Sequence, residues 1–246
     1  MEATAYPPTS RSRNYLKIGH KGAAALAPEN TIASLASALE HDVDVVEFDV
    51  IDGTGGTLVL AHSHDELVPG APSLDDALAF LAREAPPGVG IDLDLKSPGF
   101  EEKVVERLRW HGFVERSLVS SFHPASLRRV RALEPALRTG ISYPWDRRNL
   151  ATRRALAPVV WAGAKALRVA LPFRIAGMVA AAEATTAMLH HSVLSAKAVE
   201  RCHRAGVSVL AWTVDEPELL ERVLATRVDG VVSNDPRIFS TGGEPR

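Results

Sequence analysis

The sequence predicts an α/β protein, a (β/α)8 TIM barrel with a small hairpin segment inserted after the second strand. The chain has 246 residues, a length typical of one such barrel domain. Short apolar runs alternate with helical patterns over nearly the whole chain, which is typical of parallel strands joined by crossover helices. Polar residues collect where the predicted strands end, the edge at which barrels place their active sites.

Nine segments are predicted to be strands. They are Leu16–His20, Val45–Ile51, Leu58–His62, Ile91–Leu95, Leu118–Phe122, Thr139–Ser142, Ala187–His190, Val207–Val214 and Gly230–Ser233. A closed barrel needs eight, so one is surplus. We assign the surplus to Leu58–His62, because the GTGG turn before it suits a hairpin and is too short for a parallel crossover. The run Ala166–Ala170 is ambiguous.

Four helices are predicted between these strands, mainly from apolar residues that recur on one helical face. They are Thr31–His41 with Asn30 or Thr31 as its cap, a helix from Ser73 with Asp76 completing a capping box, a helix after Pro124, and Glu218–Thr226. The residues expected to be buried are Ile32, Leu35, Ala36 and Leu39 in the first, Leu74, Ala77, Leu78 and Leu81 in the second, and Leu219, Leu220, Val223 and Leu224 in the fourth.

Composition narrows the class of protein. Hydrophobic residues make up 46% and charged residues 24%, the balance of a soluble globular chain, and the net charge is −2 without a strongly basic block. Nucleic-acid binding is therefore not expected. No apolar run reaches the roughly 18–20 residues that cross a bilayer, so stable membrane insertion is not expected either. The single cysteine, Cys202, can form neither an internal disulfide nor a cysteine-rich metal cluster, and we expect it to be a small buried residue.

The chain is expected to form one domain over residues 15–240, with a polar arm at 1–14 and a tail at 241–246. The first residues lack the apolar core of a secretory signal. A cytoplasmic enzyme acting on a small molecule is the expectation, and the sequence predicts no oligomeric state.

Carboxylates are spaced two apart in two of the predicted strands. Glu47 and Asp49 point to the same face of a strand that is otherwise apolar, and Asp92 and Asp94 repeat the arrangement. Buried carboxylates are costly unless they meet a cation or hydrogen-bond donors. Several of them at one barrel mouth predict an oxygen-ligand site for Mg²⁺ or Ca²⁺. The alternative is structural ion pairing with Lys96, which could instead be a phosphate ligand.

Two histidines lie at the predicted mouth, and each could instead be an ordinary polar residue at a loop. His20 and Lys21 end the first strand, and the hairpin ends in His62-Ser63-His64-Asp65. Histidines beside a hard cation and lysines predict phosphoester chemistry. One imidazole takes a proton from the nucleophile and the other protonates the leaving oxygen, while the metal and lysines neutralise the phosphoryl charge.

In order and spacing, the chain resembles the glycerophosphodiester phosphodiesterase family from about Lys17 to Pro236. The family's opening HRG…PEN-T box corresponds here to His20-Lys21-Gly22 with Pro28–Thr31, and its E-x-D-V corresponds to Glu47–Val50. Its turn and strand ending in a histidine correspond to GTGGTLVLAHSHD, and its E-x-K corresponds to Asp94-Leu95-Lys96. The later blocks correspond to SSF at Ser120–Phe122, WTV at Trp212–Val214 and DGVVSNDP at Asp229–Pro236.

The resemblance implies a TIM barrel with a small insertion after the second strand, and hydrolysis of glycerophosphodiesters to sn-glycerol 3-phosphate and an alcohol. A neighbouring glycerol hydroxyl would attack, and a cyclic phosphate would then be hydrolysed. The implied roles are an acid–base pair at His20 and His62, a divalent cation, Mg²⁺ or Ca²⁺, at Glu47, Asp49 and Asp94, and phosphate contacts at Lys21 and Lys96. Trp212 would line the pocket and stack on substrate, or pack in the core.

Three features depart from the family pattern. Lys21 replaces an arginine, which loses the bidentate fork that suits phosphate. Asp94 replaces a glutamate and is one methylene shorter. The family's His-Asp pair matches His64-Asp65 literally, although the apolar strand leads directly into His62, which we favour.

Two other functions stay open. The same chemistry could act on a lysophospholipid and release a lysophosphatidic acid, or the barrel could bind a phosphorylated ligand without catalysis. Arg168, His190 and His191 are weaker candidates for substrate contact. The arginine-rich stretches at 128–131 and 146–149 are expected to be solvated faces.

Overall fold

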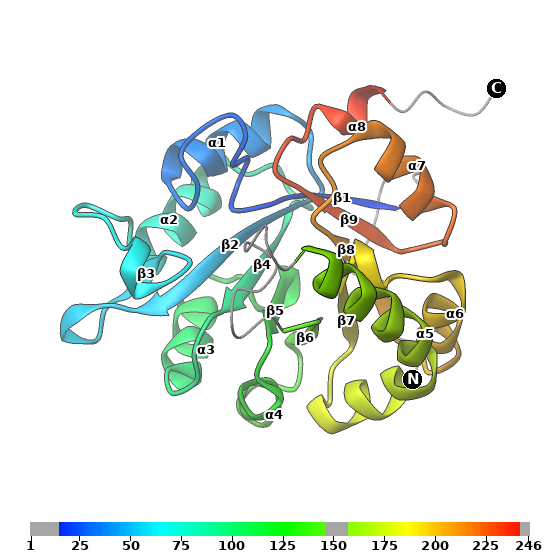
Figure 1. Ribbon diagram of the computed structural model, residues 1–246. Helices are drawn as coiled ribbons and strands as arrows, with labels where there is room; N and C mark the ends of the chain where they lie inside the picture. Colours follow the sequence, from blue (N-terminus) through cyan, green and yellow to red (C-terminus); the bar gives the residue numbers. More distant parts are fainter. Residues whose placement is uncertain (1–14, 146–156, 242–246) are drawn as a thin grey trace.

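The computed structural model describes residues 15–145 and 157–241, in which eight parallel strands close into a barrel surrounded by helices (Figure 1). In barrel order the strands are β1 (Leu16–Gly19), β2 (Val45–Asp52), β4 (Gly90–Leu95), β5 (Ser117–Ser121), β6 (Arg138–Tyr143), β7 (Thr186–His190), β8 (Ser208–Trp212) and β9 (Gly230–Ser233). Pairing of β1 with both β9 and β2 closes the ring. The TIM barrel expected from the sequence is confirmed.

The helices follow the strands in turn. They are α1 (Ile32–Glu40), α2 (Leu74–Glu84), α3 (Glu101–Trp110), α4 (Pro124–Leu133), α5 (Ala157–Ala182), α6 (Ala196–Arg204), α7 (Pro217–Leu224) and α8 (Ile238–Thr241), with short 3₁₀ turns η1 (Thr54–Gly56), η2 (His64–Glu66), η3 (Val114–Arg116) and η6 (His191–Val193). Over the described ranges, none of these helices combines the length and apolar character needed to span a membrane.

The ninth strand, β3 (Leu58–Leu60), is the surplus hairpin strand. It runs antiparallel to β2, with Leu60 opposite Val50 and Leu58 opposite Asp52. β1 pairs with β2 only at Val45 and Val46, so the far end of the same β2 edge is free to receive β3. The hairpin therefore extends the barrel wall at the carboxyl end of β2, at the left of Figure 1.

The predicted elements are present, with ends that shift by a few residues. His20, the segment 61–62 and Phe122 lie just beyond their strands instead of inside them. The ambiguous run Ala166–Ala170 is helical, inside α5. The stretch at 146–149 lies outside the described residues.

The predicted helix faces are largely, but not wholly, correct. All four apolar residues expected in α2 are buried, and Ser73 and Asp76 form the capping box. In α1 the cap is Thr31, and the face is rotated: Ala38 and Ser34 are buried with Leu35, while Ile32, Ala36 and Leu39 are only half-buried. In α7, Leu220 and Val223 are buried, whereas Leu219 and Leu224 are half-buried.

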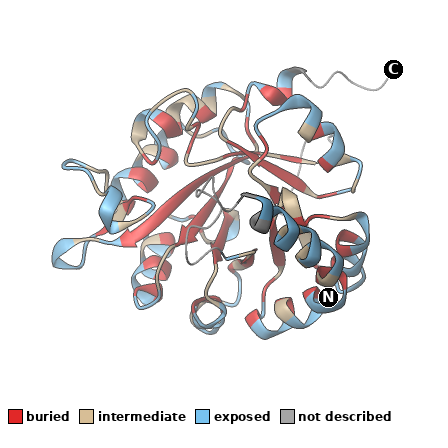
Figure 2. Cartoon of the chain, in the orientation of Figure 1, coloured by how far each residue is buried: buried red, intermediate tan, exposed pale blue. Residues whose placement is uncertain are grey.

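The core has an inner and an outer part. Most buried side chains lie between the strands and the helices, and Figure 2 shows the strands as the buried centre of the molecule. A smaller cluster combines residues of six barrel strands: Leu16, Ile18, Val45, Leu118, Met188, Leu210 and Val232. Cys202 is buried in α6, as predicted, and burial raises the pKa of its thiol to about 12.

Candidate active site

A cavity of about 380 Å³ opens at the carboxyl ends of the strands. Several of its walls are residues that continue the inward-facing row of a strand, such as His20, Ser120 and Trp212, and the others come from the core layer or from the loops after the strands. The lining residues are His20, Lys21, Glu47, His62, Asp92, Asp94, Lys96, Ser120, Phe122, Ser142, Pro144, Trp145, Met188, Trp212 and Val232. Its charged side chains come from the first part of the barrel (β1, β2, β4 and the β3 hairpin), and its aromatic side chains come from β5, β6 and β8.

A tight turn after β1 places His20 and Lys21. Lys21 and Gly22 both have left-handed backbone angles, with φ of 50° and 79°. A Cβ on Gly22 would lie 2.4 Å from the backbone of Ser34, so only glycine fits this position. The turn places two backbone N–H groups within hydrogen-bonding distance of Glu47 in β2. Lys21 N donates to Glu47 Oε2 at 2.6 Å, and Gly22 N donates to the Glu47 carbonyl at 2.8 Å.

His20 is oriented by an amide from the far end of the chain. Its Nδ1 donates to Asn234 Oδ1 at 2.7 Å, and the Asn234 amide nitrogen in turn donates to Asp215 Oδ2 at 2.7 Å. This arrangement puts the proton on Nδ1, so Nε2 is the free basic nitrogen, 3.9 Å from Glu47 Oε2. Burial lowers the pKa of His20, which favours the neutral ring.

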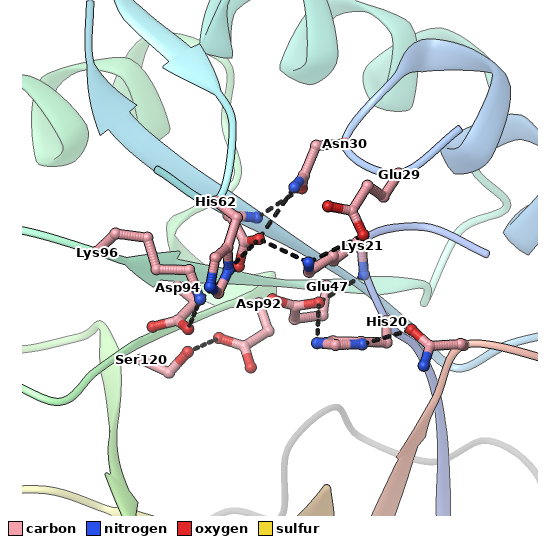
Figure 3. A network of polar contacts seen from close by, with 12 residues as sticks. His20, Lys21, Glu29, Asn30, Glu47, His62, Asp92, Asp94, Lys96 and Ser120 are labelled. Atoms are coloured by element: carbon pink, nitrogen blue, oxygen red, sulfur yellow. Dashed lines mark hydrogen bonds and ion pairs between the residues drawn. The ribbon is translucent and has the colours of Figure 1, made fainter. Parts of the chain in front are cut away.

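Asp49 is the centre of a polar network, and Figure 3 shows its partners Asn30, His62 and Lys96 converging on one region. It is fully buried, and its Oδ2 accepts hydrogen bonds from Asn30 Nδ2 at 3.0 Å and from His62 Nδ1 at 3.1 Å. Asn30 also accepts the Asp49 amide proton, at 2.9 Å. Lys96 Nζ lies 2.6 Å from Oδ1, and Lys21 Nζ lies 3.8 Å from Oδ2. Because His62 donates through Nδ1, its Nε2 is available to the cavity.

Three carboxylates are close enough to share a cation. One oxygen from each of Glu47, Asp49 and Asp94 lies within 4.8 Å of the others. Asp94 Oδ2 is 2.5 Å from Lys96 Nζ, but its Oδ1 is buried without a hydrogen-bond partner. A set of carboxylate oxygens with one unpaired is the donor chemistry that Mg²⁺ and Ca²⁺ prefer. These residues therefore fit a divalent cation.

Burial and neighbouring charges shift the pKa values of several groups in this network. Burial and the charge of Asp49 raise the pKa of Glu47 well above its usual value. Burial acts the same way on Asp49, but Lys96 and the hydrogen bond from His62 outweigh it and hold its pKa well below the ordinary range. Burial opposes the charge of Lys96, yet Asp49 and Asp94 raise its pKa. Lys96 and Asp49 are therefore both charged near neutral pH.

A fourth carboxylate, Asp92, lies beside this cluster. Its Oδ1 accepts from Ser120 Oγ at 2.8 Å, and its Oδ2 is buried without a hydrogen-bond partner. Burial raises the pKa of Asp92 to about 8, so the group carries a proton at neutral pH. It can then donate to a ligand in the cavity.

Aromatic rings form the opposite wall. Phe122 stacks on Trp145 with ring centroids 6.0 Å apart, and it meets the edge of Trp212 at the same distance. His190 packs against the other side of Trp212 at 4.9 Å. The faces of these aromatic rings can pack against an apolar or a cationic group of a ligand. The opposite wall, from β1, β2 and β4, carries the charged side chains of the cavity.

The structure brings most of the predicted site residues together. His20, Lys21, Glu47, His62, Asp94, Lys96 and Trp212 line one cavity, with Asp49 directly behind them. His64 lies apart in η2, is exposed, and its Nε2 contacts the carbonyl of Asp52 at 2.8 Å. Arg168 lines a different cavity, and His190 and His191 contact Ser192 and the Thr213 carbonyl.

The site also contains residues that are not predicted to be functional from the sequence. Asn30 is predicted only as a possible helix cap and as part of the Pro28–Thr31 box, and Asn234 only as part of the DGVVSNDP block. Phe122 and Trp145 line the cavity and are likewise absent from the predicted site residues. Asn30 has a left-handed φ of 58°, a conformation that asparagine tolerates. Its position directly before a helix start was a signal for a turn, but not for a contact with Asp49.

Comparison with known proteins finds one family and related folds. The model of the "Glycerophosphoryl diester phosphodiesterase family" matches residues 20–79 and 71–238. A glycerophosphodiester phosphodiesterase of Caldanaerobacter subterraneus is 28% identical over 90% of this chain and 94% of its own length.

Solved structures share the fold. A phosphodiesterase of Oleispira antarctica, in complex with the product sn-glycerol-3-phosphate, superposes with a TM-score of 0.70 at 23% identity, over 92% of this chain and 95% of that one. A glycerophosphodiester phosphodiesterase of Agrobacterium tumefaciens gives a TM-score of 0.68 at 19% identity, over 92% and 99%.

Proposed function

The chain belongs to the glycerophosphoryl diester phosphodiesterase family, and on that premise we propose that it hydrolyses glycerophosphodiesters to sn-glycerol 3-phosphate and an alcohol. The observation that carries the proposal is the pair of oriented imidazoles. His20 and His62 both donate through Nδ1, to Asn234 and Asp49, and both keep Nε2 for the cavity. The carboxylate cluster lies beside both rings.

In the first step, the glycerol hydroxyl next to the phosphoester attacks phosphorus. His20 Nε2 takes the hydroxyl proton, because burial holds this ring neutral. The bond between phosphorus and the alcohol oxygen breaks, and His62 Nε2 gives that oxygen a proton. In the second step water opens the cyclic phosphate, with the two histidines exchanging the roles of acid and base.

Glu47, Asp49 and Asp94 would hold Mg²⁺ or Ca²⁺, which supplies positive charge next to the phosphoryl oxygens when it is bound. Lys21 and Lys96 are the cationic side chains of the described lining, and we assign phosphate contact to both. The Lys21 ammonium is a single point charge, whereas an arginine guanidinium could donate two parallel hydrogen bonds to the phosphate. Orientation of the phosphate therefore depends more on Lys96 and the bound cation.

The alcohol portion would lie against the aromatic wall of Phe122, Trp145 and Trp212. Among the described lining residues contributed by β5 to β9 and the segments after them, none is charged. A trimethylammonium group binds aromatic faces and needs no hydrogen-bond acceptor. Glycerophosphocholine is therefore the substrate we expect to be preferred over glycerophosphoglycerol, which carries no cation for the aromatic faces.

The test is release of glycerol 3-phosphate from a panel of glycerophosphodiesters with Mg²⁺, with Ca²⁺ and with chelator. His20→Ala and His62→Gln should each lower turnover by about 10²–10⁴-fold. His64→Gln is the matched control and should leave turnover unchanged, because that ring lies outside the cavity. Metal-independent release would contradict the carboxylate assignment.

A panel without any release would contradict the proposed reaction. Release of lysophosphatidic acid from lysophosphatidylcholine micelles would then test the lysophospholipid alternative. Binding of glycerol 3-phosphate that survives His20→Ala, with no turnover of any substrate by the wild type, would favour the non-catalytic barrel.

A further inference from the structure

The outer face of α5 is largely apolar, and nothing in residues 15–145 and 157–241 covers it. Apart from three cations and two glycines, every residue of this 26-residue helix is apolar. A helix that is apolar all round is normally buried on every side. Here the inner side packs through Leu171 and Ile175, but Trp161, Val169 and Phe173 are 62%, 71% and 72% exposed.

The exposed side chains of the first part of the helix lie on one side. Trp161, Lys165 and Val169 are each four residues apart, so they form one slowly winding stripe, and the exposed Phe173 follows four residues later, directly after Pro172. Exposed alanines, Ala162 and Ala166, widen it. Figure 2 shows the first half of α5 coloured mostly as exposed, in front of the barrel strands in this view.

The charge around the stripe has a single sign. Lys165 Nζ lies 3.6 Å from the Trp161 ring centroid, and Lys197 Nζ of α6 lies 5.1 Å from that of Phe173. From 147 to 182 the sequence has no aspartate or glutamate, although the whole chain carries 30 of them. A protein of net charge −2 therefore presents Trp161 and Phe173 together with cations.

A cavity of about 290 Å³ opens beside the stripe. Trp161, Lys165 and Arg168 of α5 line it together with His191 and Arg222, and none of its described lining residues is acidic. The cavity has the size and charge for an anionic headgroup. Because His191 follows the carboxyl end of β7, this part of the stripe lies at the mouth end of the barrel.

We propose that the α5 stripe docks the protein on the surface of an anionic phospholipid bilayer. Aromatic and apolar side chains flanked by lysine and arginine are the chemistry that binds the interface between headgroups and acyl chains. A second copy of the chain fits less well, because a two-fold contact through this face would bring Lys165 and Arg168 against their own copies. The inference is independent of the reaction proposed above.

Co-sedimentation with vesicles tests the proposal. The wild type should pellet with phosphatidylglycerol–phosphatidylcholine vesicles at low salt, and far less with phosphatidylcholine alone or at high salt. The double variant Trp161→Ser/Phe173→Ser should weaken binding by at least about tenfold. Lys165→Glu should weaken it by about fivefold or more, since a cation near an anionic surface contributes roughly that factor.

Trp110→Ser is the matched control. Trp110 is 78% exposed on α3, away from the stripe, and its loss should not change vesicle binding. Thermal unfolding of each variant checks that the fold is intact. A wild type that does not pellet with anionic vesicles, or a double variant that pellets as the wild type does, overturns the proposal. Self-association that the double variant abolishes, without vesicle binding, would instead identify a second copy as the occupant.

Discussion

Lys96 is the side chain on which the stability of the carboxylate cluster depends most. Its Nζ lies 2.6 Å from Asp49 and 2.5 Å from Asp94, and both carboxylates are buried. Lys96→Met keeps the apolar stem and removes the charge. Removing one partner of a buried ion pair costs about 3–5 kcal/mol, because the remaining charge stays buried without compensation. For a chain of this size that is a decrease in Tm of roughly 6–20 °C.

The loss should depend on pH in a defined direction. The pKa of Asp49 is held well below its ordinary value of 3.8, with Lys96 as the main stabilising charge. A carboxyl with a depressed pKa stabilises the folded state above its ordinary pKa, and this contribution is lost as the pH falls. Wild type and Lys96→Met should therefore differ most near neutral pH and converge toward about pH 4 and below.

The assay is urea unfolding over a pH series in the presence of chelator. Lys103→Met is the control, since Lys103 is exposed and donates one hydrogen bond, to the Gly56 carbonyl, and it should change stability by less than about 0.5 kcal/mol. Added Mg²⁺ should restore part of the stability of Lys96→Met if the carboxylates hold a cation. A loss below about 1 kcal/mol, or one that does not narrow at low pH, would refute the reasoning.

Three further changes give separate tests. Burial raises the pKa of Asp92 to about 8, so the folded protein keeps a proton that the unfolded chain releases, and the stability of the fold decreases as the pH rises toward that value. Asp92→Asn should therefore flatten the decline in Tm with pH, measured in the presence of chelator. Parallel Tm curves for the wild type and the variant would contradict this. Gly22→Ala should cost more than about 2 kcal/mol in urea unfolding, because its Cβ meets backbone 2.4 Å away. Gly70→Ala, with φ of +82° and open space around it, should cost only the dihedral strain, so equal losses would contradict a steric cause. Trp145→Ala should lower kcat/KM for glycerophosphocholine about tenfold relative to glycerophosphoglycerol, and equal decreases would argue against a cation–π contact.

Much of the fold could be predicted because its signals are local. Each barrel strand is a short apolar run between helical patterns, and the turn before β3 is too short for any parallel connection. The carboxylates of β2 and β4 were predictable as a cluster for the same reason. Residues two apart share a face, and neighbouring parallel strands align their ends, as Glu47 and Asp92 do in the register of β2 and β4.

Other features depend on contacts that no local pattern carries. His20 and Asn234 are 214 residues apart, and only closure of the barrel brings them together. The amide of Asn30 reaches Asp49 because the backbone turns left-handed, which the sequence permits without requiring. The run Ala166–Ala170 is ambiguous by its own composition, and it is helical because it lies inside the long apolar helix α5.

The inserted hairpin explains how a βα barrel obtains its second histidine. In a barrel without it, the upper edge of β2 next to β1 would be unpaired, because β1 covers only Val45 and Val46. β3 fills this edge, and it is held on its other side by Leu60 N, which donates to the Pro72 carbonyl at 2.9 Å. The chain leaves β3 directly above Asp49, which places the His62 ring within 3.1 Å of that carboxylate. A hairpin paired on both sides therefore brings His62 to Asp49.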